Sequence, residues 1–412
     1  MLSWKILQQF DTPHYKPGEW NTIKVRLTDK GIKGFVNGQL VMESPDTVRL
    51  GGGVGLAKFR DTEAGFKRFR VAKSIPSDEI TAEVRDRLGK LIDGWEFDEP
   101  APAKAVGSLA GEGSAGPRLL RDRAKELERR AEELRKLAVR VHASAVLKEL
   151  EKEFAKPEAK VDLMRAALLV ARLDNDELDV GEYLSEVDRM TRALKATLPE
   201  DADADAKRKA LSKFLFEDRA FHGSRSEYYS RSNSYLNEVI DDREGLPLTL
   251  SMLYLGLAER IDLPAHGVGL SGHFVVRQAD GPFIDVFERG EELSKAEAEQ
   301  MARDRTGEEP VAADFAPATK RSMVLRMLRN LLGTSQEEQD IPAGMRYLDA
   351  IVLLEPTAAR ERFLRAGLLY FEKRYDEAAA DAEWLEANPS PEVPGVRVRQ
   401  LLEALSRVAE KP

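Results

Sequence analysis

Apolar and polar side chains alternate near the start of the chain in the way that β-strands require. Residues 22–27 read Thr-Ile-Lys-Val-Arg-Leu, and Asn37-Gly38 separates two further apolar-containing runs, 34–36 and 39–42. An Asn-Gly pair between such runs is a strong hairpin signal, because both residues tolerate positive φ. This segment is therefore predicted to be β structure with a tight turn at Asn37.

A helical period takes over from Arg118. Large apolar residues recur every seven positions, and alanines follow each of them after four: Leu120, Leu127, Leu134 and Val141, then Ala124, Ala131, Ala138 and Ala145. Such a seam predicts a helix that packs against a close helical neighbour. That neighbour is either another helix of the same chain, as in a helical hairpin, or a helix of another chain in an intermolecular coiled coil. Residues 99–117, built mostly from Pro, Ala, Gly, Ser and Glu, predict a flexible linker before this helix.

The middle of the chain combines one apolar helix with two strands. Pro247 suits the first turn of a helix that stays apolar and ends before Pro264. Two short runs, 273–276 and 283–287, then predict strands around an Asp-Gly-Pro turn. A capping box that begins at Ser294 predicts the start of the next helix.

The chain is predicted to be helical from Lys320 onward, with an internal repeat. Segments 349–356 and 382–389 both end in proline, and the two prolines are 33 residues apart. This spacing is close to the ~34-residue period of tetratricopeptide repeats. Tyr370 and Tyr375 resemble the aromatic helix contacts of that repeat, which makes them candidate peptide-binding residues.

Composition narrows the classes of function. The 412 residues suffice for several domains of ~100–200 residues each, and the formal net charge is −9. Without a long Lys or Arg run, such an acidic chain is not expected to bind nucleic acid. The absence of cysteine excludes disulfides, cysteine-ligated metal centres and a catalytic thiolate. With no run near the ~20 apolar residues of a membrane span and no signal peptide, a soluble protein is expected. Its compartment stays open, because residues could be missing before Met1.

His273 and Asp285 are the residues with the clearest chemistry. If their two strands pair around a three-residue loop centred on Asp280, both side chains project from the same face of the sheet, within reach of each other. A two-residue turn would place them on opposite faces. A carboxylate beside an imidazole fixes the imidazole tautomer and stabilises its cation, as a general base requires.

Five motifs occur in order across this region: Phe214-Leu-Phe-Glu217, Asn233-Ser-Tyr-Leu236, Gly245-Leu-Pro-Leu-Thr-Leu-Ser-Met-Leu-Tyr254, Gly269-Leu-Ser-Gly-His-Phe274 and Phe283-Ile-Asp285. With them, residues 160–390 resemble the SirB-like branch of the transglutaminase-like superfamily. That branch joins a transglutaminase-type (papain-like) α+β core to C-terminal tetratricopeptide repeats. The resemblance covers more than half of the chain.

In active members of that superfamily, a Cys at the start of the core helix works with a His and an Asp on the two following strands. By motif, His273 and Asp285 match the last two, but the helix start carries Pro247 and no cysteine exists to substitute. Thr249 or Ser251 is the candidate replacement nucleophile, although a hydroxyl needs a strong base and an oxyanion hole. Otherwise the His–Asp pair is a retained structural hydrogen bond or a ligand contact in the same cleft.

Other motifs are weaker. The glycine-rich segment 51–55 lacks the Lys-Ser/Thr of a phosphate-binding loop, and the acidic segment 174–179 lacks the oxygen ligands and glycine of a calcium loop. The five histidines show no metal-ligand spacing: His14, His142, His222, His266 and His273. No metal site and no cofactor are predicted.

The N-terminal β segment looks like the second half of a concanavalin/laminin-G-type sandwich of the keto-disaccharide-hydrolase kind. The residues that carry this likeness lie at 18–25, 36–41 and 53–56. A whole sandwich needs roughly twice this length, so we expect a partial sandwich. Trp4, Trp20 and Tyr15 are its candidate carbohydrate-binding residues, since aromatic rings stack on sugars.

These observations predict a multi-domain α+β protein. Its parts are a partial β-sandwich (1–75), a helix and flexible linker (76–117), a charged helical segment (118–155), a transglutaminase-like domain (156–319) and a tetratricopeptide region (320–410). The favoured function is non-catalytic binding of a protein or peptide partner, in a scaffold or regulatory role. One alternative is a hydrolase or acyltransferase that uses a hydroxyl nucleophile with His273 and Asp285. The other is carbohydrate binding through the N-terminal segment.

Overall fold

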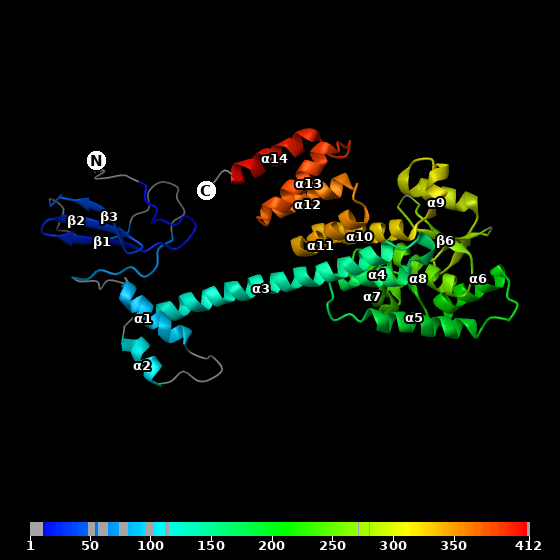
Figure 1. Ribbon diagram of the computed structural model, residues 1–412, viewed down its shortest axis with the longest axis horizontal. Helices are drawn as coiled ribbons and strands as arrows, with labels where there is room; N and C mark the ends of the chain where they lie inside the picture. The colour runs from blue at the N-terminus through cyan, green and yellow to red at the C-terminus, as the bar shows by residue number, and fades with distance from the viewer. Residues whose placement is uncertain are drawn as a thin grey trace. The chain divides into compact units, whose positions relative to one another are not determined.

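The computed structural model describes residues 11–47, 54–56, 65–73, 81–94, 103–111, 115–270, 272–279 and 281–409. The chain divides into two compact units, Met1–Arg135 and Lys136–Pro412. The boundary lies inside the long helix α3 (Ala115–Phe154), and therefore inside the charged helical segment predicted from the heptads (Figure 1).

A three-stranded antiparallel sheet lies in the first unit. Its strands are β1 (Ile23–Thr28), β2 (Gly31–Val36) and β3 (Gln39–Ser44), in that order across the sheet. Asn37 and Gly38 join β2 to β3 with φ angles of 52° and 87°, so both adopt the left-handed conformation that a two-residue hairpin demands. The predicted hairpin is confirmed.

The two faces of this sheet differ in polarity. Ile23, Val25 and Leu27 project from one face of β1 and are all exposed, Ile23 to 71%. On the other face Lys24 and Arg26 lie 5.6 and 5.4 Å from the ring of Phe35. The described part of this unit contains no second sheet to cover the apolar face.

A small helical cluster completes the first unit. Helices α1 (Ala82–Asp93) and α2 (Ala103–Gly111) pack with the start of α3 through buried Leu88, Ile92, Leu109 and Leu119. The prediction of a flexible linker is therefore wrong for residues 103–111 and 115–117, which are helical. Alanine has the highest helix propensity, and Leu109 gives the short helix an apolar contact that its composition alone did not reveal.

The second unit is a mixed α+β structure around a five-stranded antiparallel sheet of order β10-β6-β7-β8-β9. Its strands are β6 (Ala265–Val268), β7 (Val275–Gln278), β8 (Phe283–Asp285), β9 (Glu291–Leu293) and β10 (Pro317–Ala318). The short strands β4 (His222–Gly223) and β5 (Glu244–Gly245) form a separate parallel pair. Its helices before the C-terminal run are α4 (Leu163–Arg172), α5 (Val180–Lys195), α6 (Ala204–Ser212), a π-helix (Lys213–Asp218), α7 (Leu236–Asp242), α8 (Pro247–Arg260) and α9 (Lys295–Thr306).

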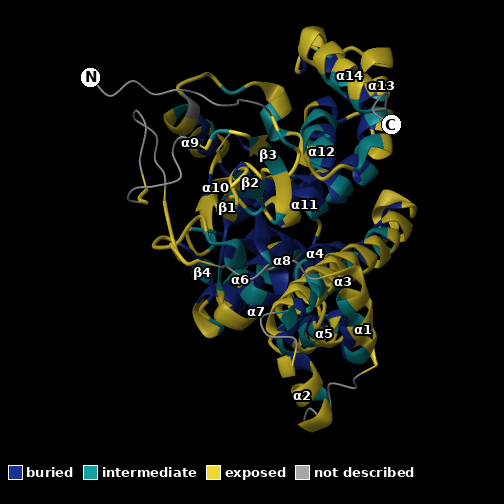
Figure 2. Cartoon of the chain, turned by 90° about the vertical axis from the view of Figure 1, so that its left-hand side faces the viewer, coloured by how far each residue is buried: buried dark blue, intermediate teal, exposed yellow. Residues whose placement is uncertain are grey.

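Helix α8 is the centre of this unit, and Figure 2 shows it among buried elements. Every residue from Pro247 to Ala258 is buried, as expected of a helix that is apolar on all sides. Pro247 lies in its first turn, and the capping box of α9 at Ser294 and Glu297 is present, so both sequence predictions are confirmed. Gly256 lets Met164 of α4 approach, because a Cβ there would lie 2.5 Å from the Met164 sulfur.

Five helices follow the sheet: α10 (Lys320–Glu337), α11 (Ile341–Leu354), α12 (Ala359–Phe371), α13 (Tyr375–Ala387) and α14 (Gly395–Ala409). Successive members pack together, and α11 and α13 end just before Pro356 and Pro389. Apolar side chains of α10 and α11, among them Leu328 and Tyr347, belong to the same hydrophobic core as α4 and α8. The core is thus continuous across residue 320, where the sequence pattern predicted a domain boundary.

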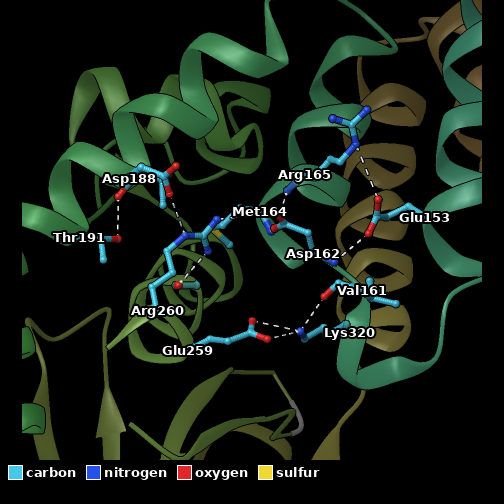
Figure 3. Close-up of polar contacts among 12 residues, drawn as sticks. Glu153, Val161, Asp162, Met164, Arg165, Asp188, Thr191, Glu259, Arg260 and Lys320 are labelled. Carbon is cyan, nitrogen blue, oxygen red and sulfur yellow. Dashed lines mark hydrogen bonds and ion pairs between the residues drawn. The ribbon is translucent and has the colours of Figure 1, made fainter. Parts of the chain in front are cut away.

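Polar contacts hold the start of α10 on this core (Figure 3). The Nζ atom of Lys320 donates to the Val161 carbonyl oxygen at 2.6 Å and to Glu259 at 2.9 Å. A second contact lies between α11 and the core, where the Asp174 carboxylate accepts hydrogen bonds from the hydroxyls of Tyr235 and Tyr347. These contacts join segments that are far apart in sequence into one rigid frame around α8.

Candidate functional site

The structure brings His273 and Asp285 together. Val276 of β7 pairs with Ile284 of β8, a register centred on position 280, and Nε2 of His273 lies 2.9 Å from Oδ2 of Asp285. Of the two registers considered from the sequence, this is the one with a three-residue loop, although Asp280 itself lies outside the described residues. Both side chains are only 1% exposed.

Asp285 is fixed by more than the histidine. Its Oδ1 atom accepts the backbone N–H groups of Phe287 at 3.0 Å and Glu288 at 3.3 Å. Because the carboxylate accepts, Nε2 of His273 carries the proton and Nδ1 is the free acceptor. Nδ1 is buried and has no hydrogen-bond partner among the residues that the structure describes. The imidazole is therefore oriented as a base would be, with nothing at the atom that would take a proton.

Arg326 of α10 positions the turn that carries His273. Its Nη2 donates to the carbonyl oxygens of His273 at 3.0 Å and Leu270 at 3.3 Å, and its guanidinium lies 5.5 Å from the ring of Phe274. Burial lowers the pKa of Arg326. The sequence analysis missed this residue, because nothing local relates it to a loop 53 residues earlier. His273 itself lies just before β7, which begins at Val275, and not within the strand as predicted.

The proposed hydroxyl nucleophiles lie on α8 and are inaccessible. Thr249 and Ser251 are 1% and 0% exposed. The Ser251 hydroxyl has no hydrogen-bond partner, so it is not bonded to His273. A serine nucleophile requires a base within hydrogen-bond reach, and this arrangement does not supply one.

Two hollows of about 670 and 450 Å³ share His222 and Arg289, and the smaller one is lined by Phe287 and Glu288, which follow Asp285 closely in the chain. Three residues that line the larger one, Ala220, Arg243 and Arg289, have φ angles of 59°, 61° and 57°. Positive φ at non-glycine residues stores backbone strain and is enriched at functional sites. Neither local periodicity nor spacing in the sequence indicated these hollows.

Phe287 contacts both the smaller hollow and His273. It lines that hollow, and its ring centre lies 6.2 Å from the imidazole in an edge-to-face arrangement. Tyr228 packs edge-on against it at 6.1 Å, and a Cβ on Gly223 would lie 2.3 Å from the ring. Gly223 therefore has to be a glycine for Phe287 to close over the histidine.

The remaining candidate residues lie elsewhere. Tyr370 and Tyr375 pack against each other at 5.6 Å across the α12–α13 turn and contact the core of the helical run. Tyr15 and Trp20 are exposed, and Nζ of Lys67 lies 3.8 Å from the Trp20 ring. Trp4 lies outside the described residues.

Two further searches of the described residues gave no site. No helix there is both long enough and apolar enough to span a bilayer. Nor does any group of three His, Asp or Glu side chains lie close enough in that part of the chain to hold a metal ion.

The apolar helix, the antiparallel strands behind it and the buried His–Asp pair define a protein with a transglutaminase-like domain. Residues 181–329 match the family model described as transglutaminase-like superfamily. The chain belongs to the UPF0162 protein family. It is 33% identical over 231 residues to a UPF0162 protein of Xylella fastidiosa strain Temecula1. The aligned residues cover 52% of this chain and 82% of that relative.

Two more relatives extend the comparison. A UPF0162 protein of Xylella fastidiosa strain 9a5c is 31% identical over 241 residues, 55% of this chain and 84% of its own. Human F-box only protein 21 is 27% identical over 175 residues, which are 39% of this chain and 27% of that protein. No solved structure matches the chain.

Proposed function

We propose that this transglutaminase-like protein is non-catalytic and binds a protein or peptide partner, in a scaffold or regulatory role. The observation that carries the proposal is the state of the His273–Asp285 pair. It keeps its mutual hydrogen bond, yet it is buried against Phe287, and no described residue is a hydrogen-bond partner of Nδ1. An acyl-transfer site needs a nucleophile at that atom and an open path to it.

The rival function is acyl transfer or hydrolysis through Thr249 or Ser251. It would require α8 to shift so that a hydroxyl reached His273 and the substrate reached both. The burial of the two hydroxyls and the unpaired state of the Ser251 oxygen argue against it.

The hollows at Phe287 are the place where we expect the partner to bind. Arg225 lines the smaller hollow, and exposed Tyr228 packs on Phe287 of the same lining; Arg and Tyr are among the residue types most enriched at binding hot spots. The helical run α10–α14 supplies a second surface if its helix pairs are tetratricopeptide repeats, which present a concave face to peptides.

The first test is an assay of amine incorporation into, and cleavage of, a mixture of protein substrates, read by mass spectrometry. We expect no turnover by the wild type or by His273→Ala. Turnover by the wild type that disappears in His273→Ala would overturn the proposal and establish the hydroxyl mechanism.

The second test concerns binding. Partners captured from an extract by the immobilised wild-type chain are identified, purified and titrated against Arg289→Glu, with Arg192→Glu on exposed α5 as the matched charge reversal. We expect Arg289→Glu to weaken the purified interaction at least tenfold and Arg192→Glu to leave it unchanged. If the purified partner bound both variants with equal affinity, the hollows would not be its binding site.

Carbohydrate binding by the N-terminal segment remains the alternative, since the rings of Tyr15 and Trp20 are exposed. A glycan array separates the two. Binding of a glycan that is lost in Trp20→Ala and unchanged in Arg289→Glu would favour carbohydrate binding.

A further inference from the structure

The middle of α3 exposes its heptad seam. Leu127, Leu134 and Val141 are 41%, 65% and 62% exposed. The two ends of the same helix are packed: Leu119 is buried in the α1–α2 cluster, and Leu150 in the core around α8. These exposed side chains favour the second of the two neighbours predicted for the seam, a helix of another chain.

We infer that this seam pairs with α3 of a second copy in an antiparallel coiled coil. Each large residue of the seam precedes an alanine by four positions. In the heptad the leucines and Val141 therefore occupy position d, and the alanines occupy position a. All of these positions lie on one continuous helix, whose own geometry fixes their spacing.

Side-chain volume selects the direction. In a parallel pair Ala131 would face Ala131 and Leu134 would face Leu134, giving alternately loose and crowded layers. An antiparallel pair that sets Ala131 against Leu134 of the second copy also sets Ala124 against Val141 and Ala138 against Leu127. Each layer then combines a small with a large residue, the arrangement that fills an interface most evenly.

Charge selects the same register. In the antiparallel register, Glu128 of each copy lies beside Arg135 of the other copy, and both side chains are exposed. The parallel pair would instead place Arg130 beside Arg135, which is repulsive, and Arg123, which already pairs with Asp93, beside Glu128. The seam from Ala124 to Val141 is short, so the dimer should dissociate on dilution.

Cross-linking tests the register, because the native chain has no thiol to compete. Purified full-length Ala131→Cys and Leu134→Cys are mixed and oxidised gently. We expect the mixture to form mainly the disulfide between unlike copies. Arg129→Cys, on the outer side of the helix, serves as the control for random collision and should give little product.

Sedimentation equilibrium over a wide range of concentration tests the association itself. We expect reversible dimerisation of the wild type and loss of the dimer in Leu134→Lys, with unchanged circular dichroism. A wild type that stays monomeric, with cross-linking no greater than that of Arg129→Cys, would disprove the dimer. Efficient cross-linking of Ala131→Cys to itself would disprove the antiparallel register.

Discussion

At the scale of single residues, the Asp285 carboxylate is the acceptor on which the local hydrogen bonding depends. Asp285 satisfies one imidazole N–H and two backbone N–H groups at once. Buried donors that lose their acceptor cost more than the bond itself contributes, which is a physical reason to retain the pair without catalysis.

We predict that Asp285→Ala lowers the free energy of unfolding by ~2–4 kcal/mol, because it leaves the buried imidazole N–H and two part-buried backbone N–H groups without an acceptor. Urea denaturation measures the change, and exposed Glu288→Ala is the control. A loss no larger than that of the control would mean that the carboxylate contributes nothing to stability.

Phe287 should decide whether reagents reach the imidazole. We predict that diethyl pyrocarbonate leaves His273 unmodified in the wild type and modifies it in Phe287→Ala, because the ring closes the path from the hollow. Peptide mass mapping reports each histidine separately, with exposed His14 as the internal standard. Equal modification of His273 in both proteins would contradict this role of Phe287.

Tyr254 gives a pH-dependent prediction. Its burial in α8 raises the pKa of the phenol to about 12 from an ordinary value of 10.0. The folded protein therefore resists ionisation that the unfolded chain undergoes, so stability is full below pH 10 and falls as the pH rises toward 12. Denaturation at several alkaline pH values should show this fall, and Tyr254→Phe should reduce it.

At the scale of elements, short sequence patterns correctly predicted the features that depend on residues close together in the chain. The Asn37 hairpin, the Pro247 start of α8 and the Ser294 cap all follow from short-range patterns, whereas the sequence left two registers open around position 280. The position of Arg326 and the role of Phe287 do not, because each depends on a contact between distant segments. Helix α2 was missed because its composition also suits a linker.

The start of α10 illustrates such a distant contact. We predict that Lys320→Ala costs ~1–2 kcal/mol, since it leaves the Val161 carbonyl and Glu259 without their donor. Hydrogen exchange of the first turn of α10 should speed up more than that of α14. Lys295→Ala, an exposed lysine paired within α9, is the matched control.

At the scale of the whole molecule, the core extends past residue 320 through α10 and α11. A chain that ends at 319 would expose the surfaces that Leu328 and Tyr347 cover, whereas one that ends at 357 keeps both helices. We predict that the chain ending at 357 gives a cooperative thermal transition and that the chain ending at 319 does not. Comparable unfolding curves for the two would mean that the helical run folds independently.

The exposed apolar face of β1 has a consequence for aggregation when the protein is heated. Strands with such a face and open edges pair readily with strands of other molecules once thermal motion loosens their surroundings. Aggregates formed on heating should therefore contain intermolecular β structure that begins in the N-terminal sheet. Val25→Lys, in the middle of that face, should delay their appearance while the α+β second unit melts at the same temperature.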